Sequence, residues 1–288
     1  MRTAHRAQDL PVGDRVVAIG SFDGVHLGHR RVLEAARAAG SVATVVTFWP
    51  HPRLVLGNRV ELLSTLERRL ELLDAAEVDE TLVVEFTPEL AQREPEEFAD
   101  SLLREIGARM IVAGENFRFG RGATGDLALL GRLGFEVRNV QLLEGFSSTR
   151  IRSLLREGDV VEAARLLGRP AEVDGTVVLG DQRGGTLGYP TANLAVPADL
   201  LVPAYGIYAG AALGHRAAVS IGVNPHYGGD ERRIEPHLLE FDGDLYGRRL
   251  VVELWQRLRD ERAFASEEEL VAQIARDVEQ TRAAVRPA

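Results

Sequence analysis

Residues 16–29 read VVAIGSFDGVHLGH, and this stretch decides the fold of the first half of the chain. The apolar run at its start favours a β-strand, Gly20 ends that strand, and a helix is expected from about Gly28 onward. Gly20 and Gly24 permit a tight backbone turn, and Gly28 gives a phosphate access to the helix N-terminus. Free N–H groups and the helix dipole attract anions there, so the stretch is suited to bind phosphate.

Two histidines follow the turn. His26 and His29 are three residues apart and share one helix face, from which both can donate hydrogen bonds to one polyphosphate. In the alternative interpretation Phe22 and Val25 are core residues and the histidines are merely solvated. The glycines, the position after a strand and the histidine spacing together favour the phosphate site.

The rest of the first half alternates between two hydrophobic patterns. Strands are expected at residues 16–19, 42–48, 81–86, 110–113 and 136–140, and helices at 28–39, 66–76, 95–106 and 126–133. Alternation of this kind predicts a parallel sheet covered by helices on both faces, a Rossmann-like α/β fold. Ligands of such sheets bind at the carboxyl ends of the strands, so the loops after strands are the candidate site.

The pattern changes after Ser148. Two helices are expected at residues 149–157 and 160–167, strands at 171–179, 206–213, 216–222, 237–241 and 250–258, and a final helix at 266–282. Short strands separated by Gly, Pro and Asp predict a small antiparallel barrel. Ser266 and Glu269 form a capping box for the final helix. We therefore expect two domains, 1–169 and 170–288, with a boundary near Arg169.

Composition excludes several classes of chemistry. The chain has 288 residues, a formal charge of -9 and no cysteine. Its 34 basic residues are all arginine, so it also lacks lysine. Disulfides, thiolate zinc sites, cysteine nucleophiles, lysine Schiff bases and a Walker-type phosphate loop are therefore excluded. Neither half has the basic excess of a general nucleic-acid binder. The first 15 residues lack the apolar stretch of a signal peptide and all apolar runs are too short to span a bilayer, so a cytoplasmic location without membrane partners is expected.

Three more segments of the first half belong with the opening motif: TFWPHP at 47–52, AGENFRFGRGATGD at 113–126 and FSSTRIR at 146–152. Together with GSFDGVHLGH at 20–29 they resemble the HxGH nucleotidyltransferases, specifically the bacterial bifunctional riboflavin kinase/FMN adenylyltransferase (FAD synthetase) family. By that resemblance the residues that bind ATP and its phosphates are Gly20, Phe22, Asp23, Gly24, His26, His29, Ser148 and Arg152. His26, His29 and Arg152 are the catalytic ones. The implied flavin-binding residues are Phe48, Pro50, His51, Asn116 and Phe117.

The residues alone leave some of these roles open. Ser148 can cap a helix, bind a phosphate or do both, and Arg152 lies one turn into the same helix. Asn116 also fits a plain turn. The aromatic side chains near these motifs fit either a core or the flanks of a flavin ring; they are Phe48, Trp49, Phe117 and Phe119.

The second half carries GDQRGGTLGYPTANL at 180–194, which resembles the RGxxLGxPTAN segment of flavokinases. The resemblance implies a kinase ATP site made of Gly180, Arg183, Gly184, Gly188, Thr191 and Asn193. Thr191 and Asn193 are also the implied ligands of Mg²⁺, a cation that takes few protein ligands and prefers oxygen.

Three further segments extend the resemblance through the second half. RRIEPHLLEFDGDLYG at 232–247 places Glu235 at the position of the kinase's general base. IGVNPHYG at 221–228 departs from the family pattern, since His226 and Tyr227 replace the usual Thr and Phe. The segment at 257–264, LRDERAF with its preceding Arg, is implied to lie near the flavin.

These matches imply a Rossmann-like adenylyltransferase joined to a Greek-key β-barrel kinase with a terminal helix. The implied reactions are phosphorylation of riboflavin to FMN and adenylylation of FMN to FAD, so ATP, riboflavin and FMN are substrates and flavin is no redox prosthetic group. One alternative keeps only the adenylyltransferase activity, with the barrel as a flavin-binding module. Glu235 and the PTAN segment (residues 190–193) argue against this alternative. The other is a role in binding nucleic acid, opposed by the acidic charge and the missing lysine. The sequence leaves the oligomeric state open.

Overall fold

The computed structural model describes residues 1–141, 144–180, 183–223 and 232–287. It divides into two compact units. The first comprises Met1–Glu61 and Leu66–Ser147, and the second comprises Leu62–Thr65 and Ser148–Ala288. Among the described residues, no helix is both long and apolar enough to cross a membrane.

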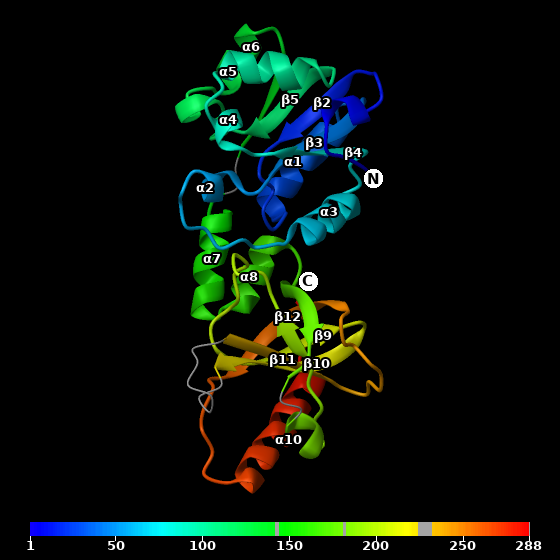
Figure 1. Ribbon diagram of the computed structural model, residues 1–288, viewed down its shortest axis with the longest axis vertical. Coiled ribbons are helices and arrows are strands. Elements are labelled where there is room, and N and C mark those ends of the chain that lie inside the picture. Colours follow the sequence, from blue (N-terminus) through cyan, green and yellow to red (C-terminus); the bar gives the residue numbers. More distant parts are fainter. Residues whose placement is uncertain (142–143, 181–182, 224–231, 288) are drawn as a thin grey trace. The chain divides into compact units, whose positions relative to one another are not determined.

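The first unit is built on a parallel six-stranded sheet with the order β1-β4-β3-β2-β5-β6 (Figure 1). The strands are β1 (Arg2–Ala4), β2 (Arg15–Ile19), β3 (Val42–Trp49), β4 (Glu80–Glu85), β5 (Ala108–Gly114) and β6 (Glu136–Val140). The chain proceeds from β2 through β3 and β4 on one side and resumes with β5 on the other side of β2. The carboxyl ends of β2 and β5 therefore flank the point where the strand order reverses, which is where such sheets bind ligands.

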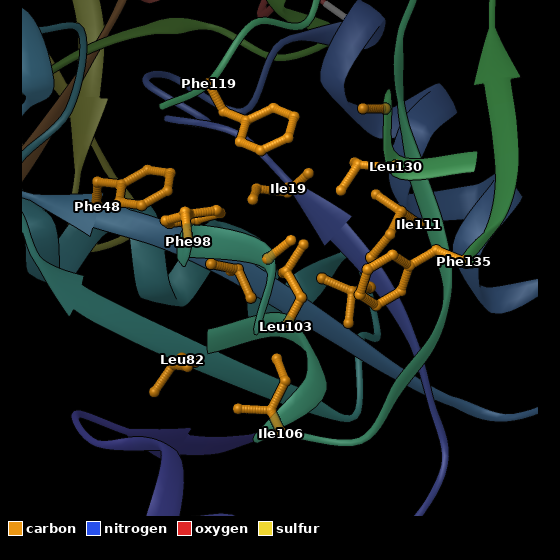
Figure 2. Packing of buried hydrophobic residues seen from close by; sticks show 14 of the residues in the cluster. Ile19, Phe48, Leu82, Phe98, Leu103, Ile106, Ile111, Phe119, Leu130 and Phe135 are labelled. Carbon is orange, nitrogen blue, oxygen red and sulfur yellow. The ribbon is translucent and has the colours of Figure 1, made fainter. Parts of the chain in front are cut away.

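Helices cover both faces of this sheet. They are α1 (Leu27–Arg37), α2 (Pro52–Val55), α3 (Leu66–Ala75), α4 (Pro88–Ala91), α5 (Pro95–Phe98) and α6 (Leu127–Arg132), with short turns η1 (Ala7–Asp9), η2 (Ala99–Arg104) and η3 (Arg121–Ala123). Strand alternation sends Val17 and Ile19 into one core cluster and Val16 and Ala18 into the other. Figure 2 shows the first cluster, in which Phe98 and Leu103 pack with side chains of the sheet. The predicted α/β fold is confirmed.

One predicted helix differs in detail. Residues 95–106 form α5 followed by η2, a π-type segment, in place of one regular α-helix. Ala99 and Leu103 remain fully buried, so the π-type turns keep the apolar side chains on the sheet. The short helices α2 and α4 were not predicted; each begins at a proline capped by the preceding His51 or Thr87.

The second unit is an antiparallel six-stranded sheet with the order β11-β10-β9-β12-β7-β8. Its elements are α7 (Ser148–Glu157), α8 (Val160–Leu167), β7 (Ala171–Val178), α9 (Arg183–Thr186), β8 (Asn193–Ala195), β9 (Gly206–Ala212), β10 (His215–Val223), β11 (Arg232–Leu238), β12 (Arg249–Arg259) and α10 (Glu267–Ala283). The backbone N–H of Ala192, just before β8, donates to Pro236 O of β11 at 3.0 Å. This bond brings the two edges of the sheet together, and the predicted small barrel with a terminal helix is confirmed.

The strand expected at residues 237–241 was placed too late, because β11 spans Arg232–Leu238. The chain turns immediately afterwards at Glu240, whose φ is +56°. Pro236 lies in β11 on the edge that faces Ala192 and there offers only its carbonyl. Ser266 caps α10 as predicted, accepting from Glu269 N at 3.3 Å.

A short segment of the first half of the chain belongs to the second unit. Leu62 N–H donates to Asp199 O at 2.6 Å and Leu62 O accepts from Leu201 N–H at 2.8 Å. Leu62 is buried, and the Thr65 hydroxyl donates to the Asp174 carboxylate. This segment is thus held by strand-like pairing at Leu62 and by a side-chain hydrogen bond at Thr65, both to residues more than a hundred positions away.

Helices α7 and α8 also belong to the second unit. Ala204 N–H donates to Leu155 O of α7 at 3.0 Å, and a Cβ at Gly158, between the two helices, would lie 2.9 Å from Arg257 Cδ. Leu166 and Leu167 of α8 are buried. The compact unit therefore begins near Ser148, whereas the boundary near Arg169 stays a prediction about which residues each activity requires.

We expect a fragment of residues 148–288 to melt at a higher temperature than a fragment of residues 170–288. The shorter fragment lacks α8, whose buried leucines contribute about 1.5–3 kcal/mol each, so a difference of at least about 5 °C is expected. Circular dichroism melts of both fragments measure it, with the full chain as reference. Equal melting temperatures would show that α7 and α8 are not part of the barrel's stable core.

Candidate active sites

The loop after β2 is held in a strained conformation by its own side chains. Phe22 and Val25 have φ values of +49° and +37°, which non-glycine residues rarely adopt, and Gly24 lies at +77°. Phe22 and Val25 are 2% and 0% exposed in the core cluster that includes Val16, so burial of their side chains offsets the backbone strain. The Thr47 hydroxyl of β3 donates to Ser21 O at 3.0 Å and fixes the loop to the neighbouring strand.

The two predicted histidines lie together at the start of α1. His26 is the N-cap, and its Nδ1 accepts from His29 N–H at 3.3 Å, which makes Nε2 the protonated nitrogen of the neutral ring. The imidazole rings stack with centroids 3.7 Å apart at 18°. A Cβ at Gly28 would lie 3.0 Å from His26 Cε1, so this glycine makes room for the His26 ring. The expectation that Gly28 gives a phosphate access to the helix end stays a prediction.

Asp23 of the same loop faces a buried arginine that the sequence analysis missed. Arg69 of α3 is 0% exposed, and its Nη2 lies 3.7 Å from Asp23 Oδ1. Its Nη1 donates to Phe48 O at 3.3 Å, and its guanidinium lies 5.4 Å from the centroid of the Trp49 ring. Burial lowers the pKa of Arg69, while the Asp23 carboxylate raises it. Arg69 thus links the loop after β2 to the end of β3.

The residues expected to bind flavin lie at the ends of β3 and β5. Phe48 packs on Phe86 and Phe98 within the core, with ring centroids 5.8 and 6.4 Å away. His51 is buried and caps α2, whereas Pro50 is exposed. Asn116 is exposed in the turn after β5 that the 2.9 Å bond from Phe117 N–H to Gly114 O closes.

Two of the aromatic side chains in question are buried in this unit. Phe48 and Phe119 are core residues, each 8% exposed. Phe117 stacks on Phe119 at 5.5 Å and 14° and remains half-buried. The flavin contacts of this unit stay a prediction. Ser148 and Arg152 lie in the second unit, at the start of α7, where Arg152 is buried; their phosphate contacts also stay a prediction.

The second unit contains a cavity of about 340 Å³ over the face of β10 and β11. Three cross-strand pairs line it, and in each pair a small residue of β10 faces a larger one of β11. The pairs are Ala218 with His237, Ser220 with Glu235, and Gly222 with Arg233. The small side chains of β10 leave room above the sheet for a ligand.

The PTAN segment forms another wall of the same cavity. Thr191 and Asn193 both line it, as residues two apart on one side of an extended chain. A Cβ at Gly180 would lie 1.9 Å from Asn193 Nδ2, and one at Gly184 would lie 2.3 Å from Tyr189 O. Glycine at both positions therefore lets the loop fold closely around Asn193 and Thr191. Residues 181–182 and the Arg183 side chain, a predicted ATP ligand, lie outside the described residues.

Glu235 is positioned by β11. It occupies the middle of β11, half-buried, opposite Ser220. The cavity thus brings Glu235 together with Thr191 and Asn193, which lie more than forty positions before it in the sequence. His226 and Tyr227, the departures from the family pattern, lie outside the described residues.

The C-terminal segment closes the cavity. Arg259 donates to both Asp277 oxygens at 2.7–3.1 Å, which fixes α10 against β12. Phe264 lines the cavity with Arg262 stacked over its ring at 4.8 Å. A Cβ at Gly222 would lie 2.1 Å from Glu261 Oε1, so this glycine lets Glu261 approach β10. Among the described residues, no cluster of three or more His, Asp or Glu side chains is arranged to hold a metal ion.

Comparison with known proteins assigns each half to a family. A riboflavin kinase family model matches residues 167–285, and an FAD synthetase family model matches residues 11–154. Among solved structures, one described as a macrolide-efflux protein from Streptococcus pneumoniae has a TM-score of 0.86 at 32% identity and covers 97% of this chain and 98% of its own. The whole chain therefore has the two-domain fold of a solved structure.

Curated relatives match over nearly the full length. The bifunctional riboflavin kinase/FMN adenylyltransferase of Listeria monocytogenes is 37% identical, covering 94% of this chain and 92% of the relative. Proteins of the same name from Escherichia coli K12 and Bacillus subtilis are 35% and 33% identical, covering 96% and 91% of this chain and 95% and 90% of the relatives. The order of the motifs, the cavity that unites Glu235 with the PTAN segment, and these matches agree. The chain belongs to the family of bifunctional riboflavin kinase/FMN adenylyltransferases.

Proposed function

We propose that this chain makes FAD in two steps, each carried out by one of its two sites. ATP phosphorylates riboflavin to FMN in the barrel, and a second ATP adenylylates FMN to FAD with release of pyrophosphate at the α/β site. The observation that carries the proposal is the single cavity lined by Thr191, Asn193 and Glu235. A phosphate-binding segment and a carboxylate base in one cavity are what phosphoryl transfer to a hydroxyl requires.

In the kinase reaction, Glu235 accepts the proton of the riboflavin 5′-hydroxyl as its oxygen attacks the γ-phosphorus of ATP. The O–P bond forms as the bond to the β-phosphate oxygen breaks, and ADP leaves. Glu235 is suited to this role because it points into the cavity from the middle of a strand, where its position is fixed by the pairing with β10. The small residues opposite leave space for the substrate.

The donor set of the PTAN segment fits Mg²⁺. Thr191 and Asn193 offer a hydroxyl and an amide oxygen, neutral ligands suited to a cation that is shared with ATP phosphates and water. The close approach of the Gly180 and Gly184 backbones to these side chains leaves the donors directed along one wall of the cavity. Bound Mg²⁺ would neutralise phosphate charge there, with Thr191 and Asn193 as its protein ligands.

In the adenylyl transfer, a phosphate oxygen of FMN attacks the α-phosphorus of ATP and pyrophosphate leaves. The attacking group is already an anion, so the site needs positioning and charge neutralisation in place of a base. The strained loop from Gly20 to Gly24 and the stacked pair of His26 and His29 supply both at the carboxyl end of β2. His26, with Nε2 as its donor nitrogen, is set to donate a hydrogen bond to a phosphate oxygen.

We expect His29→Ala to lower FAD formation from supplied FMN by about 10²-fold, the usual loss when one charge-stabilising donor is removed. FMN formation by the same preparation should stay within a few-fold of the parent chain. Chromatographic separation of FMN and FAD measures both. His5→Ala, at an exposed histidine of the same unit, is the matched control and should change neither activity. Equal loss of both activities in His29→Ala would contradict the assignment of His29 to one site.

We expect Glu235→Gln to lower riboflavin kinase turnover by about 10²- to 10⁴-fold, because the amide keeps the size of the side chain but cannot accept the proton. ATP affinity and FAD formation from supplied FMN should be unchanged. Glu240→Gln, an exposed acid just after β11, provides the control for loss of one carboxylate. Near-normal turnover of the Gln variant at 235 would remove Glu235 from the mechanism.

We expect Thr191→Val to raise the Mg²⁺ concentration needed for half-maximal kinase activity by about 10-fold or more, because valine keeps the shape but loses the oxygen ligand. A titration with MgCl₂ at fixed ATP measures the shift. The Mg²⁺ dependence of FAD formation from FMN serves as the internal reference and should stay constant. An unchanged kinase titration would exclude Thr191 as a ligand.

A further inference from the structure

His237 belongs to the kinase cavity, but neither proposed reaction uses it. Side chains of β11 alternate: Ile234, Pro236 and Leu238 are buried on one face, while Glu235 and His237 line the cavity on the other. His237 is therefore one step along the same face from the proposed base. Its partner across the sheet is Ala218, which is too small to hold the imidazole in place.

The position of the His237 ring is set by the segment before Thr191. Its Nδ1 lies 2.7 Å from Pro190 O. A carbonyl oxygen only accepts hydrogen bonds, so Nδ1 carries the proton and donates. The edge-to-face contact with Tyr189, at 5.5 Å between centroids and 80° between planes, supports the same ring orientation.

A second bond completes the attachment. Ala192 N–H donates to Pro236 O at 3.0 Å, so residues 190 and 192 are both bonded to β11, one on each side of Thr191. Pro190 contributes a restricted φ to the same segment. The backbone around Thr191 is thus held at two points by the strand that carries Glu235. The His237 side chain supplies one of these points and the backbone of Pro236 supplies the other.

We propose that His237 is a positioning residue of the kinase: its bond to Pro190 holds Thr191 and Asn193 at a fixed distance from Glu235. In-line transfer requires the γ-phosphorus, held by the PTAN segment, to lie close to the hydroxyl that Glu235 deprotonates. The imidazole fixes these two groups relative to each other and does not touch the reacting atoms. This inference rests on the proposed function of the barrel cavity.

The test compares His237→Asn with His237→Gln in the full chain. The amide nitrogen of Asn is as many bonds from Cβ as histidine Nδ1, so it can donate to Pro190 O, whereas the amide nitrogen of Gln is one bond farther out. We expect the His237→Asn variant to keep kcat/KM for ATP within a few-fold of the parent value. We expect His237→Gln to lower kcat/KM for ATP by about 10- to 100-fold, chiefly through a higher KM for ATP. Riboflavin affinity without ATP, measured by quenching of flavin fluorescence, should be the same in both.

The barrel offers a matched control for the bond itself. His215 of β10 has Nδ1 3.2 Å from Leu239 O and an edge-to-face contact with Phe241 at 5.3 Å and 80°, yet it does not line the cavity. His215→Gln removes the same kind of bond from the same barrel, and we expect its kinase constants to match the parent. FAD formation from supplied FMN reports the concentration of folded enzyme in each preparation.

Two outcomes would overturn the inference. If His237→Asn lowers kcat/KM for ATP as much as His237→Gln does, the bond to Pro190 does not explain the role of the His237 ring. If His215→Gln loses as much kinase activity as His237→Gln, the loss reflects general stability of the barrel. Glu235→Gln, run alongside, tests the proposed function separately. If Glu235→Gln phosphorylates riboflavin at the parent rate, Glu235 is not the base. The contrast between His237→Asn and His237→Gln still decides the inference about the bond to Pro190.

Discussion

The kinase cavity depends on the register between β10 and β11. Because side chains alternate along a strand, the pairing of Ser220 with Glu235 directs Glu235 and His237 into the cavity and Pro236 into the core. A shift of one residue would exchange the two faces and bury the proposed base. The same register puts Gly222 where Glu261 crosses the sheet, a contact that a Cβ at this position would exclude.

The α/β site is fixed by a different device. There the backbone itself adopts a strained turn, and the side chains of Phe22 and Val25 hold it by being buried in the core. Arg69 adds a charged contact with Asp23 in the interior, where an ionic group requires a partner. One site is therefore shaped by rows of side chains on a sheet, and the other by a loop whose hydrophobic residues act as anchors.

Most of the architecture followed from hydrophobic periodicity. Residues 136–140 and 160–167 were predicted with the observed bounds, because each pattern stops at a clear break. β11 was placed too late, and only the fold shows that Pro236 lies within this strand, on an edge where its carbonyl is used. The motifs identified Glu235, Thr191 and Asn193, yet they could not show that these side chains share a cavity.

Residues that act through others were missed. Arg69 interrupts the apolar stripe of Leu66, Leu72 and Leu73 in α3, and a charge in such a stripe was the signal that could have identified it. His237 gave no such signal, because its role depends on Pro190, 47 positions away. The missed contacts are long-range pairs, and neither local propensity nor spacing encodes them.

The pairing of residues 62–65 with the second unit bears on how the chain folds as it is synthesised. These residues leave the ribosome well before Asp174, Asp199 and Leu201, their hydrogen-bond partners. Domains generally fold in order from the N-terminus, so the first unit can form its parallel sheet before residues 174–201 have been synthesised. Leu62, which is buried in the folded chain, then stays exposed in the nascent chain until residue 201 has emerged. An early segment is thus captured by a late one, and nascent chains halted before residue 201 lack the backbone partners of Leu62.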